Sequence, residues 1–208
     1  MTYPFDETTR RAVAERCAAF PRVAADAAGL ARAAVAVVLV QADEPAGAAA
    51  FVLTRRTADL RAHRNQWALP GGRCDAGETA AAAALRELAE EVGLRLAPDA
   101  VLGLLDDYPT RSGYLITPVV MWAAGAADLT PSAAEVASVH RIPLAAAARP
   151  DAFDFIAIPE SDRRVVRFHV DGHSIHAPTA AVIYQFREVL AGRATRVADL
   201  EQPVFAWR

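Results

Sequence analysis

Three glutamates near the middle of the chain have the spacing of a metal site. Glu87, Glu90 and Glu91 stand at i, i+3 and i+4 within residues 79–92, a segment whose pattern predicts a helix. That spacing predicts that the three carboxylates project from one helix face, where like charges repel by roughly 0.2–0.5 kcal/mol per pair. Carboxylate oxygens are the ligands that hard divalent cations prefer. The spacing therefore predicts a site for Mg²⁺ or Mn²⁺ on this helix.

The residues before the helix add a flexible loop and a cation. Glycines at positions 71, 72 and 77 allow the loop to fold tightly against the helix start, and the backbone carbonyl of Gly72 is a candidate metal ligand. Arg86 is a candidate for a bidentate pair with Glu78. The alternative interpretation, a solvated acidic face on a surface helix, accounts for neighbouring glutamates but not for this whole arrangement.

The elements that must position these residues alternate between strands and helices. A first helix is expected at 8–20, and the helix at 79–92 is expected to end at Gly93. Strands are expected at 33–41 and 48–55, which form a hairpin, and then at 101–107, 114–123, 135–142, 153–158 and 163–170. Asp171-Gly172 predicts a tight turn, and a last helix is expected at 179–191. This order predicts one α+β or α/β/α domain.

The composition excludes several classes of protein. Of 208 residues, 53% are hydrophobic and 23% are charged, which is typical of a folded globular chain. The longest apolar run, 33–40, is less than half of a membrane span, so we expect no membrane partner. The first residues show neither a basic nor an apolar signal segment, and Cys17 and Cys74 have no metal-site spacing. We therefore expect a cytoplasmic protein with reduced thiols.

The charged residues exclude one class of partner and two kinds of mechanism. The 22 basic residues against 25 acidic ones give a net charge of −3, so we expect no nucleic-acid partner. All 22 basic residues are arginine, which excludes a P-loop and any Schiff-base mechanism, since both need a lysine. The planar guanidinium group suits phosphate recognition.

The fixed positions around the acidic helix form a longer motif. They run Gly72-x5-Glu78-x7-Arg86-Glu87-Leu88-x-Glu90-Glu91-x-Gly93-Leu94. This pattern resembles the signature of the Nudix hydrolase family. The resemblance implies a mixed sheet between helices, an α/β/α sandwich, and hydrolysis of a nucleoside diphosphate linked to another moiety. It also implies Mg²⁺ or Mn²⁺ held by Glu87, Glu90, Glu91 and the Gly72 carbonyl, with Glu78 and Arg86 as orienting residues of the catalytic group.

The segment before the motif resembles the extra signature of the coenzyme A branch of that family. It reads Leu53-Thr54-Arg55-Arg56-Thr57-x3-Arg61-x3-Asn65-x3-Leu69-Pro70-Gly71-Gly72. The resemblance implies that Thr54, Arg56 and Arg61 bind the substrate. Glu135 falls where the family often has a further catalytic or metal-assisting glutamate. The implied reaction converts coenzyme A or acyl-coenzyme A to 3′,5′-ADP and a 4′-phosphopantetheine.

Two alternatives stay open at this point. One is a pyrophosphatase for ADP-ribose or another nucleoside diphosphate derivative, and the more distant one is a non-catalytic ligand sensor of the same fold. We divide the chain into an N-terminal helical extension at 1–29, a catalytic domain at 30–192 and a tail at 193–208. We expect a small-molecule diphosphate substrate as the binding partner, and a homodimer is one alternative for the assembly.

Overall fold

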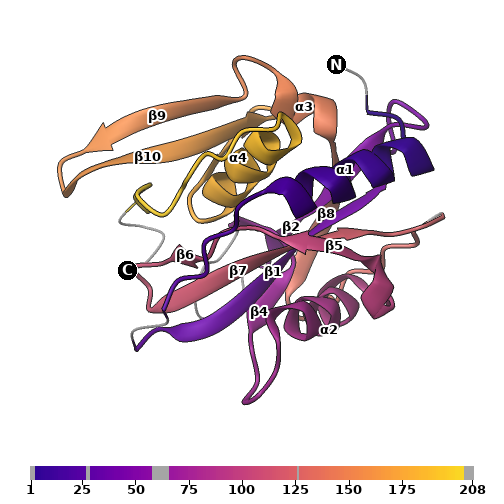
Figure 1. The fold of residues 1–208 in the computed structure, drawn as a ribbon, viewed down its shortest axis with the longest axis horizontal. Helices are drawn as coiled ribbons and strands as arrows, with labels where there is room; N and C mark the ends of the chain where they lie inside the picture. Colours follow the sequence, from indigo (N-terminus) through magenta and orange to yellow (C-terminus); the bar gives the residue numbers. More distant parts are fainter. Residues whose placement is uncertain (1–2, 27–28, 58–65, 126, 204–208) are drawn as a thin grey trace.

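A mixed β-sheet forms the centre of the computed structural model, which describes residues 3–26, 29–57, 66–125 and 127–203 (Figure 1). Its main path is β3-β2-β1-β7-β5, and β4, β6 and β8 pair with β1, β7 and β2. The strands are β1 (Ala31–Gln41), β2 (Ala49–Arg56), β3 (Trp67–Ala68), β4 (Gly71–Arg73), β5 (Val101–Leu104), β6 (Tyr108–Pro109), β7 (Tyr114–Trp122) and β8 (Val136–Pro143). The strand β1 runs parallel to β7 and antiparallel to β2, which confirms the predicted hairpin and the mixed sheet.

The two faces of β1 explain its uninterrupted apolar sequence. Ala34, Ala36 and Val38 face the helix α2 (Ala80–Val92), which carries the three glutamates. Val37 and Leu39 belong to the core on the other face of the sheet. A strand that is covered on both faces needs apolar residues at every position instead of alternate ones.

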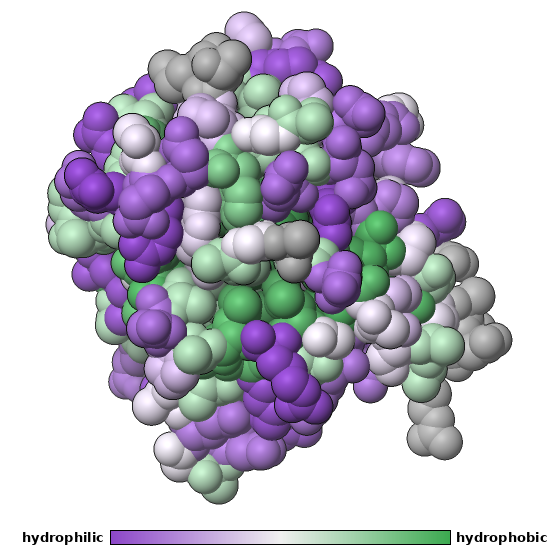
Figure 2. Space-filling view, turned by 90° about the vertical axis from the view of Figure 1, so that its right-hand side faces the viewer, coloured by the Kyte–Doolittle hydropathy of each residue, from purple (hydrophilic) through white to green (hydrophobic). Residues whose placement is uncertain are grey.

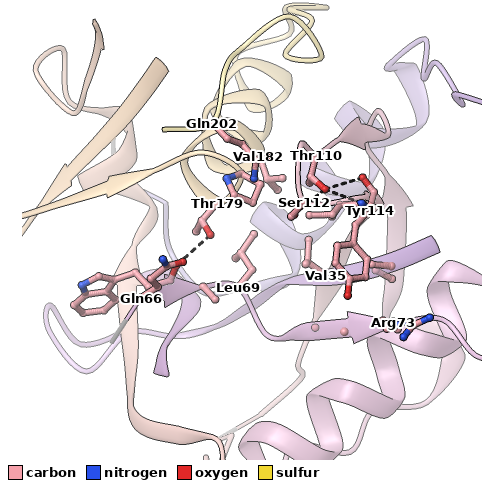
Figure 3. A pocket seen from close by; sticks show the side chains of 18 of the residues that line it. Val35, Gln66, Leu69, Arg73, Thr110, Ser112, Tyr114, Thr179, Val182 and Gln202 are labelled. Carbon is pink, nitrogen blue, oxygen red and sulfur yellow. Dashed lines mark hydrogen bonds between the residues drawn. The ribbon is translucent and has the colours of Figure 1, made fainter. Parts of the chain in front are cut away.

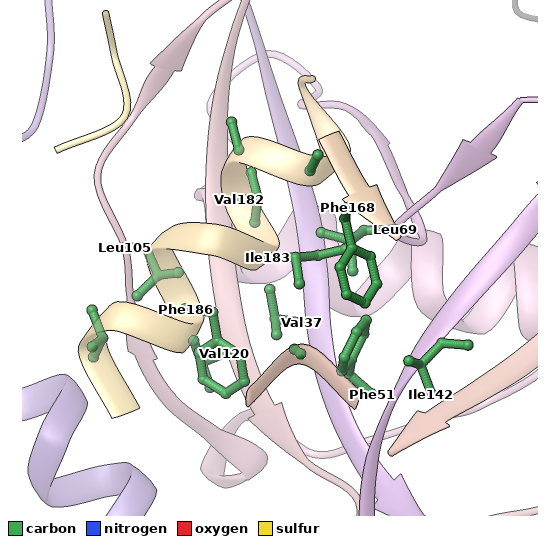
Figure 4. Close-up of a cluster of buried hydrophobic side chains, with 14 of the residues drawn as sticks. Val37, Phe51, Leu69, Leu105, Val120, Ile142, Phe168, Val182, Ile183 and Phe186 are labelled. Atoms are coloured by element: carbon green, nitrogen blue, oxygen red, sulfur yellow. The ribbon is translucent and has the colours of Figure 1, made fainter. Parts of the chain in front are cut away.

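Three helices and a second sheet cover the other face. They are α1 (Glu7–Ala19), α3 (Leu144–Ala148), α4 (Thr179–Leu190) and the antiparallel strands β9 (Phe153–Ile158), β10 (Ser161–Val170) and β11 (His173–His176). Figure 4 shows Ile183 and Phe186 of α4 in one cluster with Phe51 and Phe168. In Figure 1, α2 lies on the opposite side of the sheet, so the predicted α/β/α sandwich is confirmed.

The long predicted elements agree with the observed ones, whereas the helix α3, the strand β11 and several shorter elements were not predicted. Strands β3, β4 and β6 and the 3-10 helix η1 (Pro98–Ala100) contain two or three residues, too few for a periodic pattern. The predicted Asp171-Gly172 turn is confirmed, since both residues have positive φ angles, 48° and 76°. The predicted strand at 101–107 ends earlier, at Leu104, because Asp106 and Asp107 take part in side-chain hydrogen bonds.

Both terminal segments pack on the central part through these two aspartates. Arg196 of the tail donates to both Asp106 oxygens at 3.0 and 2.8 Å, and Arg22 donates to Asp107 at 2.8 Å. The tail continues to Glu201, which pairs with Arg111 at 2.6 Å. These contacts attach both terminal segments to the central part of the chain. The predicted domain boundaries at residues 29 and 192 stay predictions.

The surface is mostly hydrophilic with small apolar areas. Figure 2 shows such areas, enclosed by hydrophilic side chains, on the face at the right-hand side of Figure 1. Val23 is the one large hydrophobic side chain that is mostly exposed among the described residues. None of the described helices combines the length and the hydropathy that a membrane span requires.

Candidate active site

Helix α2 has well-defined ends that place its glutamates. Thr79 caps the N-terminus, where its side chain accepts a hydrogen bond from the backbone N–H of Ala82 at 3.2 Å. Gly93 ends the helix with a φ angle of 72°, the left-handed conformation that favours glycine. The helix packs closely on β1 because Ala80, Ala83 and Ala84 are small and buried.

Arg86 lies at the centre of the acidic group. Its Nε and Nη2 donate to the two oxygens of Glu78 at 3.1 and 3.0 Å, which confirms the predicted bidentate pair. Its Nη1 donates to Glu87 at 2.8 Å and to Glu90 at 3.3 Å. Its Nη2 also donates to the carbonyl oxygen of Arg73 at 3.0 Å. One guanidinium group therefore joins the loop before the helix to the helix itself.

The three predicted metal ligands differ in burial. Their spacing predicts one common face, but the Glu91 side chain is 4% exposed, that of Glu87 is 16% exposed and that of Glu90 is 60% exposed. Glu91 points toward the sheet, where its Oε2 accepts from the backbone N–H of Gly71 at 3.1 Å. The pKa of Glu91 is raised to about 7, mainly by burial and less by the charges of Glu87 and Glu135, against the lowering effects of the Gly71 N–H and of Arg56.

Gly72 leaves the space that the Glu87 carboxylate occupies. A Cβ atom added at Gly72 would lie 2.3 Å from Oε1 of Glu87, so a side chain there would displace the Glu87 carboxylate. Strand β4 holds Gly72 beside Ala34 of β1, which fixes the loop against the start of α2. The structure thus brings two of the predicted metal ligands, Gly72 and Glu87, into contact range.

The donor set suits a hard divalent cation. In the described ranges, no three carboxylate, imidazole or thiol groups converge on one point as ready ligands. Guanidinium groups lie at these carboxylates instead: Arg86 at Glu87 and Glu90, and Arg56 at Glu91. The carboxylate oxygens are the ligand type of Mg²⁺ and Mn²⁺, and a bound ion would replace part of these guanidinium contacts. These residues therefore fit the implied metal.

Arg56 and Glu135 lie at the same site. Nη1 of Arg56 lies 3.3 Å from Oε1 of Glu91, and its Nη2 lies 3.9 Å from the exposed carboxylate of Glu135. Glu135 comes directly before β8, and the backbone N–H of Thr57 donates to its carbonyl oxygen at 3.0 Å. The pairing of β2 with β8 therefore brings together two residues that are far apart in sequence.

The other two predicted substrate contacts are placed differently. Thr54 is 1% exposed, and its hydroxyl donates to the carbonyl oxygen of Ala68 at 3.3 Å. That hydrogen bond supports the pairing of β2 with β3, so any effect of Thr54 on the substrate acts through the position of β3. Arg61 lies outside the described residues.

Comparison with known proteins identifies the family. Residues 30–159 match the NUDIX domain model. The chain belongs to the NUDIX family. A protein named "Uncharacterized Nudix hydrolase NudL" from Photorhabdus laumondii is 34% identical over 141 residues, 66% of this chain and 75% of that protein. A protein of the same name from Escherichia coli is 38% identical over 117 residues, 56% of this chain and 59% of that protein.

Solved structures of the Nudix family share the fold. A MutT/nudix family protein from Enterococcus faecalis aligns over 78% of this chain and 62% of its own, with a TM-score of 0.53 and 18% identity. RenU, a Nudix hydrolase from M. smegmatis, aligns over 78% of this chain and 87% of its own, with a TM-score of 0.51 and 24% identity. These structures support the Nudix fold. The chain is thus a Nudix hydrolase, an enzyme class that acts on pyrophosphate bonds of nucleoside diphosphate derivatives.

A cavity of about 340 Å³ opens beside the Nudix motif. Gly71, Gly72 and Arg56 line it, and Gly71 and Arg56 also contact Glu91 of the acidic helix. Figure 3 shows the cavity from close by. The other lining residues include Val35, Leu69, Arg73, Ser112, Tyr114, Ile116, Val182 and Gln202. Arg73, Ser112, Tyr114 and Gln202 were not predicted as site residues, because they come from three separate segments that only the fold brings together. No local pattern could have found them.

Replacing Arg86 with alanine is expected to lower both stability and turnover. The change removes the cation between Glu78, Glu87 and Glu90 and detaches the Nudix loop from the helix. Because the Arg86 side chain is partly exposed, we expect a loss of about 1–3 kcal/mol in the free energy of unfolding, less than for a fully buried pair. Urea unfolding measures this loss. Arg10→Ala, which breaks an exposed pair with Glu7, is the matched control, and an equal effect of both variants would contradict the prediction.

Proposed function

We propose that this Nudix hydrolase cleaves the pyrophosphate bond of coenzyme A or acyl-coenzyme A, giving 3′,5′-ADP and a 4′-phosphopantetheine. The observation that carries the proposal is the position of Arg56, a residue of the coenzyme A-like signature. Arg56 contacts Glu91 of the acidic helix and also lines the adjacent cavity. A signature residue therefore lies where a substrate would extend from the reacting phosphates into the cavity.

The acidic helix supplies the hydrolytic part of the site. Glu87, Glu90, Glu91 and the Gly72 carbonyl would hold Mg²⁺ or Mn²⁺. When bound, such an ion neutralises phosphate charge and lowers the pKa of a bound water. Arg86 holds the loop and the helix in register through Glu78, which fixes the distance between Gly72 and the glutamates. Glu135 is the candidate for a further catalytic carboxylate, since it lies by Arg56 at the same site.

Arg56 has a free donor for the substrate. Its Nε–H is buried and has no hydrogen-bond acceptor within the described part of the chain. A buried donor without an acceptor costs about 1–3 kcal/mol. A phosphate oxygen bound at this edge of the cavity would supply the acceptor, with the charge assistance that guanidinium–phosphate contacts provide.

The choice between Mg²⁺ and Mn²⁺, the cytoplasmic location and a homodimer stay predictions.

The 3′-phosphate of coenzyme A provides the test of substrate. Dephospho-coenzyme A lacks this phosphate, and an arginine must recognise it because the chain has no lysine. Arg61 occupies the second arginine position of the signature. We expect the wild type to prefer coenzyme A by roughly 10- to 150-fold in kcat/KM, and Arg61→Ala to remove most of that preference with the dephospho rate similar.

Steady-state kinetics with both substrates measure this preference. Arg163→Ala, a change of an exposed arginine in the second sheet, is the matched control and should keep the wild-type ratio. Equal rates of the wild type with coenzyme A and dephospho-coenzyme A, together with faster turnover of ADP-ribose, would contradict the proposal. ADP-ribose would then be the better candidate substrate.

A further inference from the structure

We infer that the cavity beside the Nudix motif binds the pantetheine arm of the substrate, and that the side-chain amide of Gln202 donates a hydrogen bond to an amide carbonyl of that arm. The inference rests on the proposed function and names the part of the substrate that the cavity takes. Three observations carry it: the charge distribution in the cavity, the state of Gln202 and the shape of the apolar wall.

Positive charge and apolar surface lie at different parts of the cavity. The cations that line it, Arg56 and Arg73, come from the segments that also contact the acidic helix, through Glu91 and Arg86. No aspartate or glutamate belongs to the lining residues of the described chain. The phosphates of a substrate would therefore bind where Gly72, Arg56 and Arg73 line the cavity, and the remaining lining residues, which carry no charge, would face an uncharged moiety.

Gln202 presents a buried hydrogen-bond donor to the cavity. The residue is 2% exposed and lines the cavity wall near Val182 and Thr179 (Figure 3). Its Oε1 accepts from the backbone N–H of Arg111 at 2.6 Å, which fixes the orientation of the amide. Its Nε2 is then left without an acceptor among the residues that the structure describes. A donor that lines a cavity and has no acceptor from the protein takes its acceptor from a ligand or from water.

Ser112 supplies the complementary acceptor. It lines the same cavity, and its hydroxyl donates to Oγ1 of Thr110 at 3.1 Å, so its oxygen lone pairs stay available. An amide group has one carbonyl acceptor and one N–H donor, and the pantetheine arm contains two amides. Gln202 and Ser112 therefore match the two polar groups of a secondary amide.

Aliphatic side chains line the cavity together with two aromatic ones, Trp67 and Tyr114. Val35, Leu69, Ile116 and Val182 contribute aliphatic surface to it. The ring of Trp67 is already packed against the rings of His140 and His173, with centroids 4.5 and 5.1 Å apart. Aromatic rings prefer stacked or edge-to-face partners. An aliphatic wall instead suits the dimethyl-substituted pantetheine chain.

Calorimetric binding of free pantetheine, which has no phosphate, tests the inference. We expect the wild type to bind it, and Gln202→Glu to bind it about 3- to 10-fold more weakly, because this variant keeps an acceptor for Arg111 and loses the donor. The KM for coenzyme A should rise by a similar factor with kcat unchanged, and inhibition by 3′,5′-ADP should stay at the wild-type level. Ser112→Ala is a second variant with the same expected pattern, and melting temperatures confirm that both variants fold.

The outcomes separate this inference from the proposed function. Hydrolysis of coenzyme A by a wild type that does not bind pantetheine would overturn the inference and leave the function standing. Weaker inhibition by 3′,5′-ADP in both variants, with pantetheine binding unchanged, would also overturn it and place the adenine end in the cavity. Pantetheine binding that depends on Gln202, without coenzyme A hydrolysis, would support the cavity assignment and overturn the function.

Discussion

Replacing Glu90 with glutamine is expected to lower kcat by about 10²-fold or more and to leave the fold intact. Glutamine keeps the size of the side chain but removes the negative charge that a divalent cation needs. The Glu90 side chain is 60% exposed and pairs with Arg86 at 3.3 Å, so the neutral substitution costs little stability. Initial rates at saturating Mg²⁺ or Mn²⁺, with a melting curve for each variant, measure both parts of the prediction.

The exposed glutamate Glu15 on α1 provides the matched control. Glu15→Gln makes the same chemical change on another helix and should leave turnover at the wild-type level. Excess EDTA should abolish turnover of the wild type. A Glu90→Gln variant that retains most of its activity would show that Glu90 is not a metal ligand. Undiminished turnover in EDTA would show that the reaction needs no divalent cation.

Replacing Asp106 with alanine is expected to lower the free energy of unfolding by about 3–5 kcal/mol. The buried carboxylate accepts from Arg196, from Nε2 of Gln185 at 2.8 Å and from the backbone N–H of Val23 at 2.7 Å. Its removal leaves donors from the N-terminal segment, from α4 and from the tail without an acceptor, and the alanine also leaves space in the core.

Urea unfolding of the two proteins measures the effect of Asp106→Ala. Asp151→Ala removes a carboxylate that is exposed and pairs with the exposed Arg149, so it should change the free energy of unfolding by at most about 0.5 kcal/mol. A loss below about 1 kcal/mol for Asp106→Ala would show that the network is not what holds the terminal segments on the core.

The long elements and the motif were predictable because their signals are local. The apolar run of β1 and the pattern of α2, with Gly93 at its end, predicted both elements within two residues of their observed bounds. The bidentate pair between Glu78 and Arg86 was also predictable, since the two residues lie eight positions apart in one loop and helix.

The burial of the glutamates was predictable in principle but was missed. Ala80, Ala84 and Leu88 form the buried stripe of α2, and Glu91 continues it at helical spacing. Phasing the three glutamates against that stripe would have placed Glu91 inside and Glu90 outside. The helix spacing alone says only which residues are neighbours.

The tertiary parts of the site could not be predicted. Gln202 reaches the cavity because the tail returns to the turn at Arg111, and nothing near Gln202 in sequence encodes that contact. Thr54 was predicted to bind the substrate from its place in the signature, yet its hydroxyl is taken by a backbone carbonyl in the sheet. A sequence motif records which residue occupies a position but not whether its side chain reaches the site.

Product analysis by mass spectrometry tests the central claim most directly. The purified protein is incubated with coenzyme A, ADP-ribose, NADH and deoxynucleoside triphosphates in parallel, with Mg²⁺ or Mn²⁺, and Glu90→Gln serves as the blank. We predict that coenzyme A is the fastest substrate and that its products are 3′,5′-ADP and 4′-phosphopantetheine. Intact coenzyme A beside rapid formation of AMP and ribose 5-phosphate from ADP-ribose would contradict the account.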